Sequence, residues 1–171
     1  DDGSYVHVPH DEALQLSESF TLQAWIYPTT PANGWQGLLT KWSNEGGYGL
    51  FIDEEGRLTL RVRGENGQTA AVRSETAFRK PTLIRGSYQA PNWYFVAAVY
   101  DASSGEVTLY QQRQREWPGE QLSSTTTESI NLAPEPTDAD FIMSGFRQTF
   151  GADESLVEGH FNGKIDGPRV Y

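Results

Sequence analysis

Apolar side chains recur at every second position through most of this chain, and this spacing limits the chain to a β-sheet fold. In RLTLRVR, residues 57–63, leucine and valine alternate with threonine and arginine. Because successive side chains of a strand point to opposite faces of a sheet, this pattern predicts an antiparallel strand with one buried face. FTLQAWIYP, residues 20–28, alternates in the same way. Only DEAL, residues 11–14, suggests a turn of helix.

One segment is apolar on both of its alternating faces. In NWYFVAAVY, residues 92–100, one set of alternate positions runs from Trp93 to Val99 and the other from Tyr94 to Tyr100. Both sets consist of aromatic and aliphatic residues. The segment is therefore expected to be a central strand or to have its outer face covered, with Trp93 in the core.

Turn sequences separate these strands about every ten residues, as is typical of all-β sandwiches. They include Asn-Gly pairs and two glycine-containing loops, in IDEEGRLTL and YDASSGEVTLY, that predict hairpins. Polar or proline-rich composition predicts loops at residues 27–37, 111–129 and 132–140. The expected fold is a single antiparallel β-sandwich of jelly-roll type that spans residues 1–171.

Charge and composition narrow the range of partners. The net charge is −10, from 23 acidic and 13 basic residues, and this field repels the phosphates of nucleic acids and anionic membranes. No apolar run approaches the length of about 20 residues that a membrane-spanning helix needs. The chain has no cysteine, which excludes disulfides and thiolate metal sites but indicates no particular compartment.

Several segments together resemble a laminin G-like domain of the concanavalin A-like jelly-roll class, from Tyr5 to Tyr171. The resemblance rests on FTLQAWIYP, on WYFVAAVYD leading into a hairpin, and on the closing GKIDGPRVY. It implies that the first and last strands pair with each other. A domain cut from a larger protein would then begin and end in strands, as this chain does.

A narrower resemblance links QGLLTKWSNEGGYGLFID and HFNGKIDGPRVY to the β-sandwich domain in the large subunit of N,N-dimethylformamidase-type amidohydrolases. In that family the iron-dependent hydrolytic site lies in a different domain. The resemblance therefore implies a non-catalytic accessory module that packs against other domains or subunits of its parent protein.

Catalytic motifs are not evident in the sequence. There is no Gly-x-Ser-x-Gly elbow and no His-Glu-x-x-His helix, and GHFNGKI, residues 159–165, is too short for a phosphate-binding loop. The acidic residues gather in turns rather than as facing pairs on strands, which is unlike a glycosidase. We therefore expect no catalysis by this domain alone.

Calcium is the metal that the sequence suggests, because this cation binds several loop oxygens. If the chain ends meet, Asp2 and Asp166 would be candidate ligands, and Asp138 with Asp140 forms a second candidate pair. The alternative is that all four are solvated acidic residues. His7 and His160 would also approach each other if the first and last strands pair, but no third ligand for a transition metal is apparent.

Two tryptophans lie in predicted loops, where a large apolar ring has no evident core role. Trp35 lies in NGWQG and Trp117 in REWPGE. Each is a candidate platform for stacking on a sugar ring, as in a carbohydrate-binding module with a structural calcium. Each is equally a candidate contact with neighbouring domains, since interfaces also select aromatic residues. The sequence leaves both interpretations open.

Overall fold

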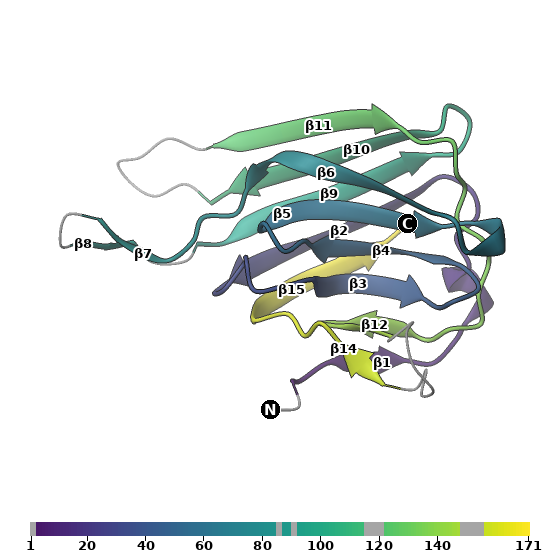
Figure 1. The fold of residues 1–171 in the computed structure, drawn as a ribbon, viewed down its shortest axis with the longest axis horizontal. Coiled ribbons are helices and arrows are strands. Elements are labelled where there is room, and N and C mark those ends of the chain that lie inside the picture. Colours follow the sequence, from purple (N-terminus) through teal and green to yellow (C-terminus); the bar gives the residue numbers. More distant parts are fainter. Residues whose placement is uncertain (1–2, 85–86, 90–91, 115–121, 148–155) are drawn as a thin grey trace.

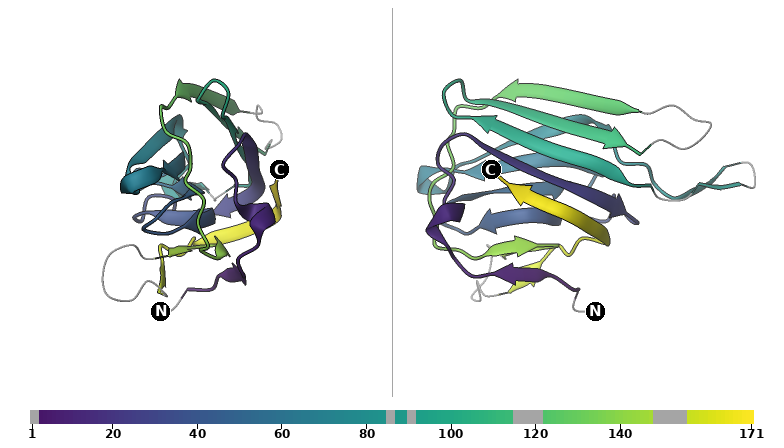
Figure 2. Two further views of the ribbon diagram at one scale, coloured as in Figure 1. Left: turned by 90° about the vertical axis from the view of Figure 1, so that its right-hand side faces the viewer. Right: turned by 180° about the vertical axis from the view of Figure 1, so that it is seen from behind.

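The computed structural model of this chain describes residues 3–84, 87–89, 92–114, 122–147 and 156–171. Two antiparallel sheets lie face to face and form a β-sandwich (Figures 1 and 2). The first sheet contains, in spatial order, β1 (Val6–Val8), β12 (Phe141–Met143), β3 (Gln36–Trp42), β4 (Gly47–Ile52), β5 (Arg57–Arg63) and β6 (Thr69–Ala77). The second contains β11 (Ser123–Ser129), β10 (Glu106–Arg113), β9 (Tyr94–Asp101), β2 (Phe20–Pro28) and β15 (Gly163–Val170).

The core lies between the two sheets and follows the alternation in the sequence. Leu22 and Ile26 of β2 and Val96 of β9 are fully buried, and they face Leu50 and Leu60 of the opposite sheet in one apolar cluster. Burial of each such side chain contributes about 1.5–3 kcal/mol to folding. The predicted all-β jelly-roll sandwich is confirmed, and each sheet includes neighbouring strands that are distant in sequence, such as β12 with β3 and β2 with β15.

Short elements complete the described structure. The predicted helical turn is a 3-10 helix, η1 (Glu12–Leu14), in which the Asp11 carboxylate accepts a hydrogen bond from the amide of Ala13. A second 3-10 turn, η2 (Glu65–Gly67), joins β5 to β6. Two small hairpins pair β7 (Thr82–Ile84) with β8 (Ser87–Gln89) and β13 (Phe146–Arg147) with β14 (Val157–Glu158). Among the helices of the described residues, none is long and apolar enough to cross a membrane.

Both predicted hairpins form, and the turn between β4 and β5 shows why. The Asp53 carboxylate accepts hydrogen bonds from the amides of Glu55 and Arg57, at 3.0 and 2.9 Å. Gly56 has a φ of 85°, a left-handed conformation that glycine adopts without steric cost. The second hairpin joins β9 to β10, with Asp101 opposite Glu106.

The predicted pairing of the first and last strands is wrong for β1. β15 pairs with β2, Ile165 opposite Ile26, whereas β1 pairs with β12, Val8 opposite Phe141. The chain changes sheets between β1 and β2, so the two strands lie in different layers of the sandwich. β15 therefore meets the second strand of the chain instead of the first.

A second correction concerns SSTTTES, which was predicted as part of the loop 111–129. These residues form β11, an edge strand that pairs with β10 and places Thr126 opposite Leu109. Thr126 is buried and most of its neighbours in the strand are exposed. Threonine is β-branched and suits a half-buried strand, so the polar composition reflects an edge strand with a solvated face.

The prediction of a central position for residues 92–100 is confirmed, because β9 is the middle strand of the five-stranded sheet. The alternate residues from Tyr94 to Tyr100 face the core and are buried. Ala97, on the other face, is also buried. Trp93, which was expected in the core, instead precedes β9 and is only half-buried. The central position of the strand is therefore as predicted, whereas the core position of Trp93 is not.

Candidate functional site

Aromatic side chains from neighbouring strands share the outer face of the five-stranded sheet. Since alternate residues of β2 and β9 fill the core, Trp25, Tyr27 and Phe95 point away from it. The register places Trp25 directly opposite Phe95. Figure 2, right, shows this sheet from outside, with purple β2 between yellow β15 and teal β9. We call the surface formed by Trp25, Tyr27, Trp93, Phe95 and Tyr110 the aromatic belt.

Contacts between the rings hold the aromatic belt in place. The Trp25 and Phe95 rings meet edge to face with 5.6 Å between centroids, and Phe95 meets Tyr110 in the same way at 6.1 Å. Tyr27 and Trp93 are 5.5 Å apart. Such pairs contribute about 0.5–1.5 kcal/mol each beyond the area that they bury. The belt is therefore a preformed surface rather than a set of independent side chains.

The aromatic belt remains accessible within this chain. Trp25 is 39% exposed, and Val99, on the same face of β9, is 41% exposed. A hollow of about 230 Å³ lies at one end, between Trp25, Trp93, Gln114 and Asp166. Aromatic residues with polar neighbours at their margin are typical of protein interfaces, where aromatic side chains are enriched. The candidate site is therefore an interaction surface.

Trp35, the predicted ligand-binding or domain-contact residue, lies on the other sheet, directly before β3. Its half-buried ring meets Phe51 edge to face at 6.0 Å between centroids, and the Arg61 guanidinium lies 4.7 Å from its centroid. Arg61 also lies 4.8 Å from the centroid of the buried Trp42 ring. These partners within the chain give Trp35 a packing role. Its role in ligand binding stays a prediction.

Trp117 and Asp2 lie outside the described residues, so the predictions for both stay predictions. Asp166 is exposed on β15, opposite Trp25 at the margin of the aromatic belt. The calcium site predicted for Asp2 and Asp166 is therefore not described by the structure. Asp166 instead contributes a negative charge beside the belt.

Asp140, a predicted calcium ligand, is surrounded by hydrogen-bond donors of its own chain. One carboxylate oxygen accepts from the His7 Nε2, at 2.8 Å, and from the Arg147 guanidinium. The other oxygen accepts from the amide of His10 at 3.0 Å. Burial alone would raise the pKa of Asp140, but the bonds from His7, His10 and Arg147 outweigh it and lower the pKa.

A buried lysine lies beside the same carboxylates. The Lys41 ammonium lies 3.0 Å from His10 Nδ1 and donates a hydrogen bond to the carbonyl of Ala139. Burial lowers the pKa of Lys41, whereas the charges of Asp140 and Asp138 act to raise it. These carboxylates thus already have cationic neighbours, which is unfavourable for binding calcium. Within the described ranges, no group of three or more histidine or acidic side chains is arranged to hold a metal ion.

The two histidines predicted to meet have different partners. His7, on β1, binds Asp140 on the segment leading into β12. The His160 ring stacks on Tyr5, with 5.8 Å between centroids. This follows from the pairing of β1 with β12 instead of β15.

Sequence comparison now identifies the family. Residues 1–171 match the laminin G-type profile described as the concanavalin A-like lectin/glucanases superfamily. The chain belongs to the concanavalin A-like lectin/glucanases superfamily. Among solved structures, it is similar to the CBM40 of the Ruminococcus gnavus IT-sialidase bound to alpha2,6 sialyllactose, with a TM-score of 0.63 at 19% identity, over 98% of this chain and 89% of that one. Domains LG4-5 of the mouse laminin alpha1 chain give a TM-score of 0.58 at 16% identity, over 99% of this chain and 39% of that one.

Two curated relatives show the kind of larger protein in which a similar domain occurs. The N,N-dimethylformamidase beta subunit of Paracoccus aminophilus is 30% identical, and that of Alcaligenes sp. is 28% identical, each over 99% of this chain. In both cases the matched region is 22% of the relative's length. The sandwich is therefore one part of a larger protein in these relatives, as the sequence resemblance implied.

The aromatic belt was not predicted from the sequence, although a signal for it is present. In a sandwich of two sheets, only one face of each strand packs against the core. A strand that is apolar on both faces therefore has one apolar face directed outward. Residues 92–100 have this pattern, and Trp25 and Tyr27 occupy the non-core positions of the alternation in residues 20–28. The pairing of β2 with β9 places these aromatic side chains side by side.

Proposed function

We propose that this chain is a non-catalytic β-sandwich module of an N,N-dimethylformamidase-like large subunit, and that it docks onto the rest of that polypeptide through the aromatic belt. The two curated relatives support the parent protein, since each aligns with nearly the whole chain. Their remaining length supplies the surface against which the module packs.

The exposed aromatic belt is the observation that carries the proposal. A preformed aromatic face over β2, β9 and β10 has the composition of an interface core, and Gln112 and Asp166 give it polar neighbours. Covering exposed rings such as Trp25 removes apolar surface from water at about 25 cal/mol per Å². The module thus holds a defined orientation relative to the catalytic part.

Hydroxyl-radical footprinting of Trp25 and Val99 tests this docking. In the isolated chain both side chains react, because they are 39% and 41% exposed. In the full-length parent protein we expect both to be protected. Trp42, which is 2% exposed, is the internal reference and reacts little in either form. Equal reactivity of Trp25 and Val99 in both forms would exclude the aromatic belt as the docking surface.

A charge substitution provides the matched test. Val99→Lys places an ammonium on the face of β9 that carries the belt and should accelerate proteolytic release of the module from the full-length protein, while leaving the isolated chain folded. Gln68→Lys adds the same charge at an exposed turn beside β6, on the other sheet, and should not change the release rate. The proposal fails if both variants release the module at the same rate.

A further inference from the structure

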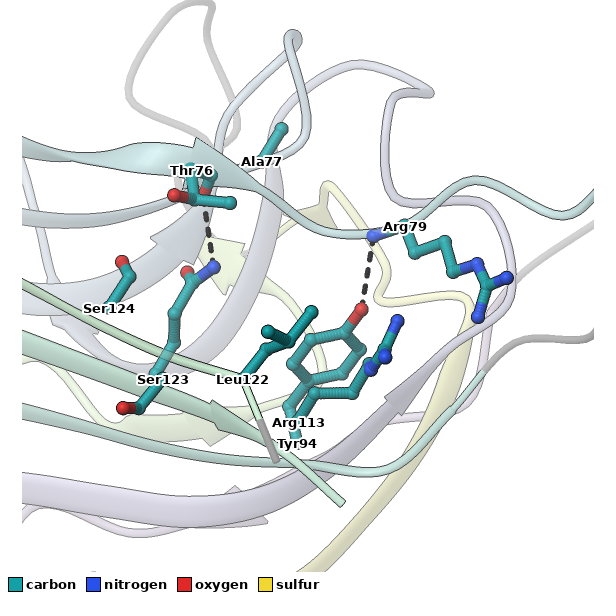
Figure 3. A pocket seen from close by; sticks show the side chains of 9 residues that line it. Thr76, Ala77, Arg79, Tyr94, Arg113, Leu122, Ser123 and Ser124 are labelled. Atoms are coloured by element: carbon teal, nitrogen blue, oxygen red, sulfur yellow. Dashed lines mark hydrogen bonds between the residues drawn. The ribbon is translucent and has the colours of Figure 1, made fainter. Parts of the chain in front are cut away.

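A pocket opens between the two sheets at one end of the sandwich (Figure 3). Its volume is about 450 Å³. The end of β6 and Arg79, two residues beyond it, form one side, and strands β9, β10 and β11 form the other (Figure 3). The lining residues are Thr76, Ala77, Arg79, Tyr94, Gln111, Arg113, Leu122, Ser123 and Ser124. This pocket is separate from the aromatic belt, because Tyr94, Gln111 and Ser124 lie on the inner faces of their strands.

The strand alternation places polar groups on the inner face at this end. Along β10 the core positions are Val107 and Leu109, and the same face continues with Gln111 and then Arg113. Ser124 of β11 lies opposite Gln111 in the register. The inner face of β10 therefore changes from apolar to polar along the strand, and buried polar groups require hydrogen-bond partners.

Three polar atoms in the pocket are buried without a hydrogen-bond partner. They are Gln111 Oε1, Arg113 Nε and Ser124 Oγ. The Gln111 side chain is 4% exposed, and its amide nitrogen donates to the carbonyl of Thr76 at 3.0 Å, which fixes the orientation of the amide. A buried polar group without a hydrogen-bond partner destabilises the folded state. Of the five such atoms among the described residues, these three lie in one pocket, whereas Arg63 Nε and His160 Nδ1 lie elsewhere. This cluster provides hydrogen-bonding groups that a polar ligand could use.

The pocket also has a distinct charge and an apolar wall. Among the described residues that line it, Arg79 and Arg113 carry guanidinium groups and none is acidic. This is unusual in a chain with a net charge of −10. The Tyr94 hydroxyl accepts a hydrogen bond from the amide of Arg79 at 3.2 Å, which positions the phenol ring beside Leu122 (Figure 3).

We propose that this pocket binds a small carboxylate that also carries hydroxyl groups, the chemistry of a sugar acid. The Arg113 guanidinium binds the carboxylate, because charge-assisted hydrogen bonds between a guanidinium and a carboxylate are stronger than those between neutral groups. One ligand hydroxyl donates a hydrogen bond to Gln111 Oε1. A second ligand hydroxyl forms a hydrogen bond with Ser124 Oγ. The carbon skeleton lies against Tyr94 and Leu122. The site is non-covalent and independent of the docking role proposed above.

Calorimetric titration of this chain with glucuronate, glucose and inorganic phosphate tests the assignment. Glucuronate should bind in the millimolar range or tighter, and glucose, which lacks the carboxylate, should bind at least about tenfold more weakly. Phosphate offers an anion without the hydroxylated skeleton and should also bind more weakly. Equal affinity for phosphate would mean a non-selective anion site and would overturn the proposal. Absence of glucuronate binding up to about 10 mM would overturn it as well.

Matched serine variants locate the site. Ser124→Ala removes a pocket hydroxyl and should weaken glucuronate binding about fivefold, the effect of one hydrogen bond. Ser129→Ala removes an exposed hydroxyl at the far end of the same strand and should leave binding unchanged. Arg113→Met keeps the length of the side chain and should weaken binding about tenfold or more. Thermal unfolding confirms that each variant is folded, and unchanged affinity in folded Ser124→Ala and Arg113→Met would exclude this pocket.

Discussion

The Arg61 guanidinium lies 4.7 Å from the centroid of the Trp35 ring, on the outer face of the six-stranded sheet. The same guanidinium lies 4.8 Å from the Trp42 ring and 5.6 Å from the Phe51 ring. Burial lowers the pKa of Arg61, and the neighbouring charges of Arg63 and Arg73 lower it further. The negative faces of aromatic rings favour a cation, so they offset part of this unfavourable environment.

Replacement of Arg61 by alanine should therefore destabilise the fold. The cation–π contacts and the packing of the side-chain stem are lost together, and we expect a decrease of about 2 kcal/mol in the free energy of unfolding. Urea denaturation measures this decrease. Arg169→Ala, at an exposed position on β15, is the control and should hardly move the midpoint. A similar midpoint for both variants would show that the rings contribute no net stabilisation.

Two tryptophans should differ in their contribution to stability. Trp42 is 2% exposed and meets Phe51 edge to face, so Trp42→Ala should cost about 3–5 kcal/mol. Trp93 is half-buried on the outer face, so Trp93→Ala in the isolated chain should cost roughly half of that or less. Chemical denaturation of both variants measures the difference. Equal losses would contradict the outward position of Trp93.

The hydrogen bonds of Asp140 predict a dependence of stability on pH. Because the pKa of Asp140 is lowered in the folded state from its ordinary value of 3.8, its contribution is fully present above about pH 4. It is lost as the pH falls through the lowered folded pKa. Asp140→Asn should reduce the free energy of unfolding by about 1.5–3 kcal/mol at pH 7, and the difference from wild type should shrink below pH 4. Urea midpoints between pH 2.5 and 7 measure this.

Glu18→Gln is the control for that series, since Glu18 is exposed and lies away from the Asp140 cluster. Its midpoint should follow that of the wild type throughout the pH range. A difference between wild type and Asp140→Asn that stays constant from pH 7 to pH 2.5 would contradict a role for the ionised carboxylate.

Calcium should not raise the melting temperature through Asp138 and Asp140. Asp140 binds His7 and Arg147, and the ammonium of Lys41 is nearby, so a divalent cation would have to displace or approach positive charges. We expect the melting temperature in about 1 mM calcium to equal that in EDTA for this site. A calcium-dependent rise that disappears in Asp138→Asn would show the opposite. A rise that disappears only in Asp166→Asn would support the other predicted site.

Prediction from the sequence succeeded where local patterns decide the outcome. The alternation in residues 20–28 and 57–63 identified strands β2 and β5, and the turns in IDEEGRLTL and YDASSGEVTLY identified two hairpins. It failed for SSTTTES, because the polar face of an edge strand has the composition of a loop. It also failed for Trp93, because alternation separates two faces without showing which one is buried.

The sequence by itself determined the sandwich class and the family, because side-chain periodicity and turn chemistry act between residues close together in the chain. Only the tertiary structure decided the positions that depend on long-range pairing. The register of β2 against β9 assembles the aromatic belt, and the alignment of β10 with β11 brings Gln111 and Ser124 into one pocket. Such contacts join residues far apart in sequence, so their partners are fixed only when the two sheets close over a common core.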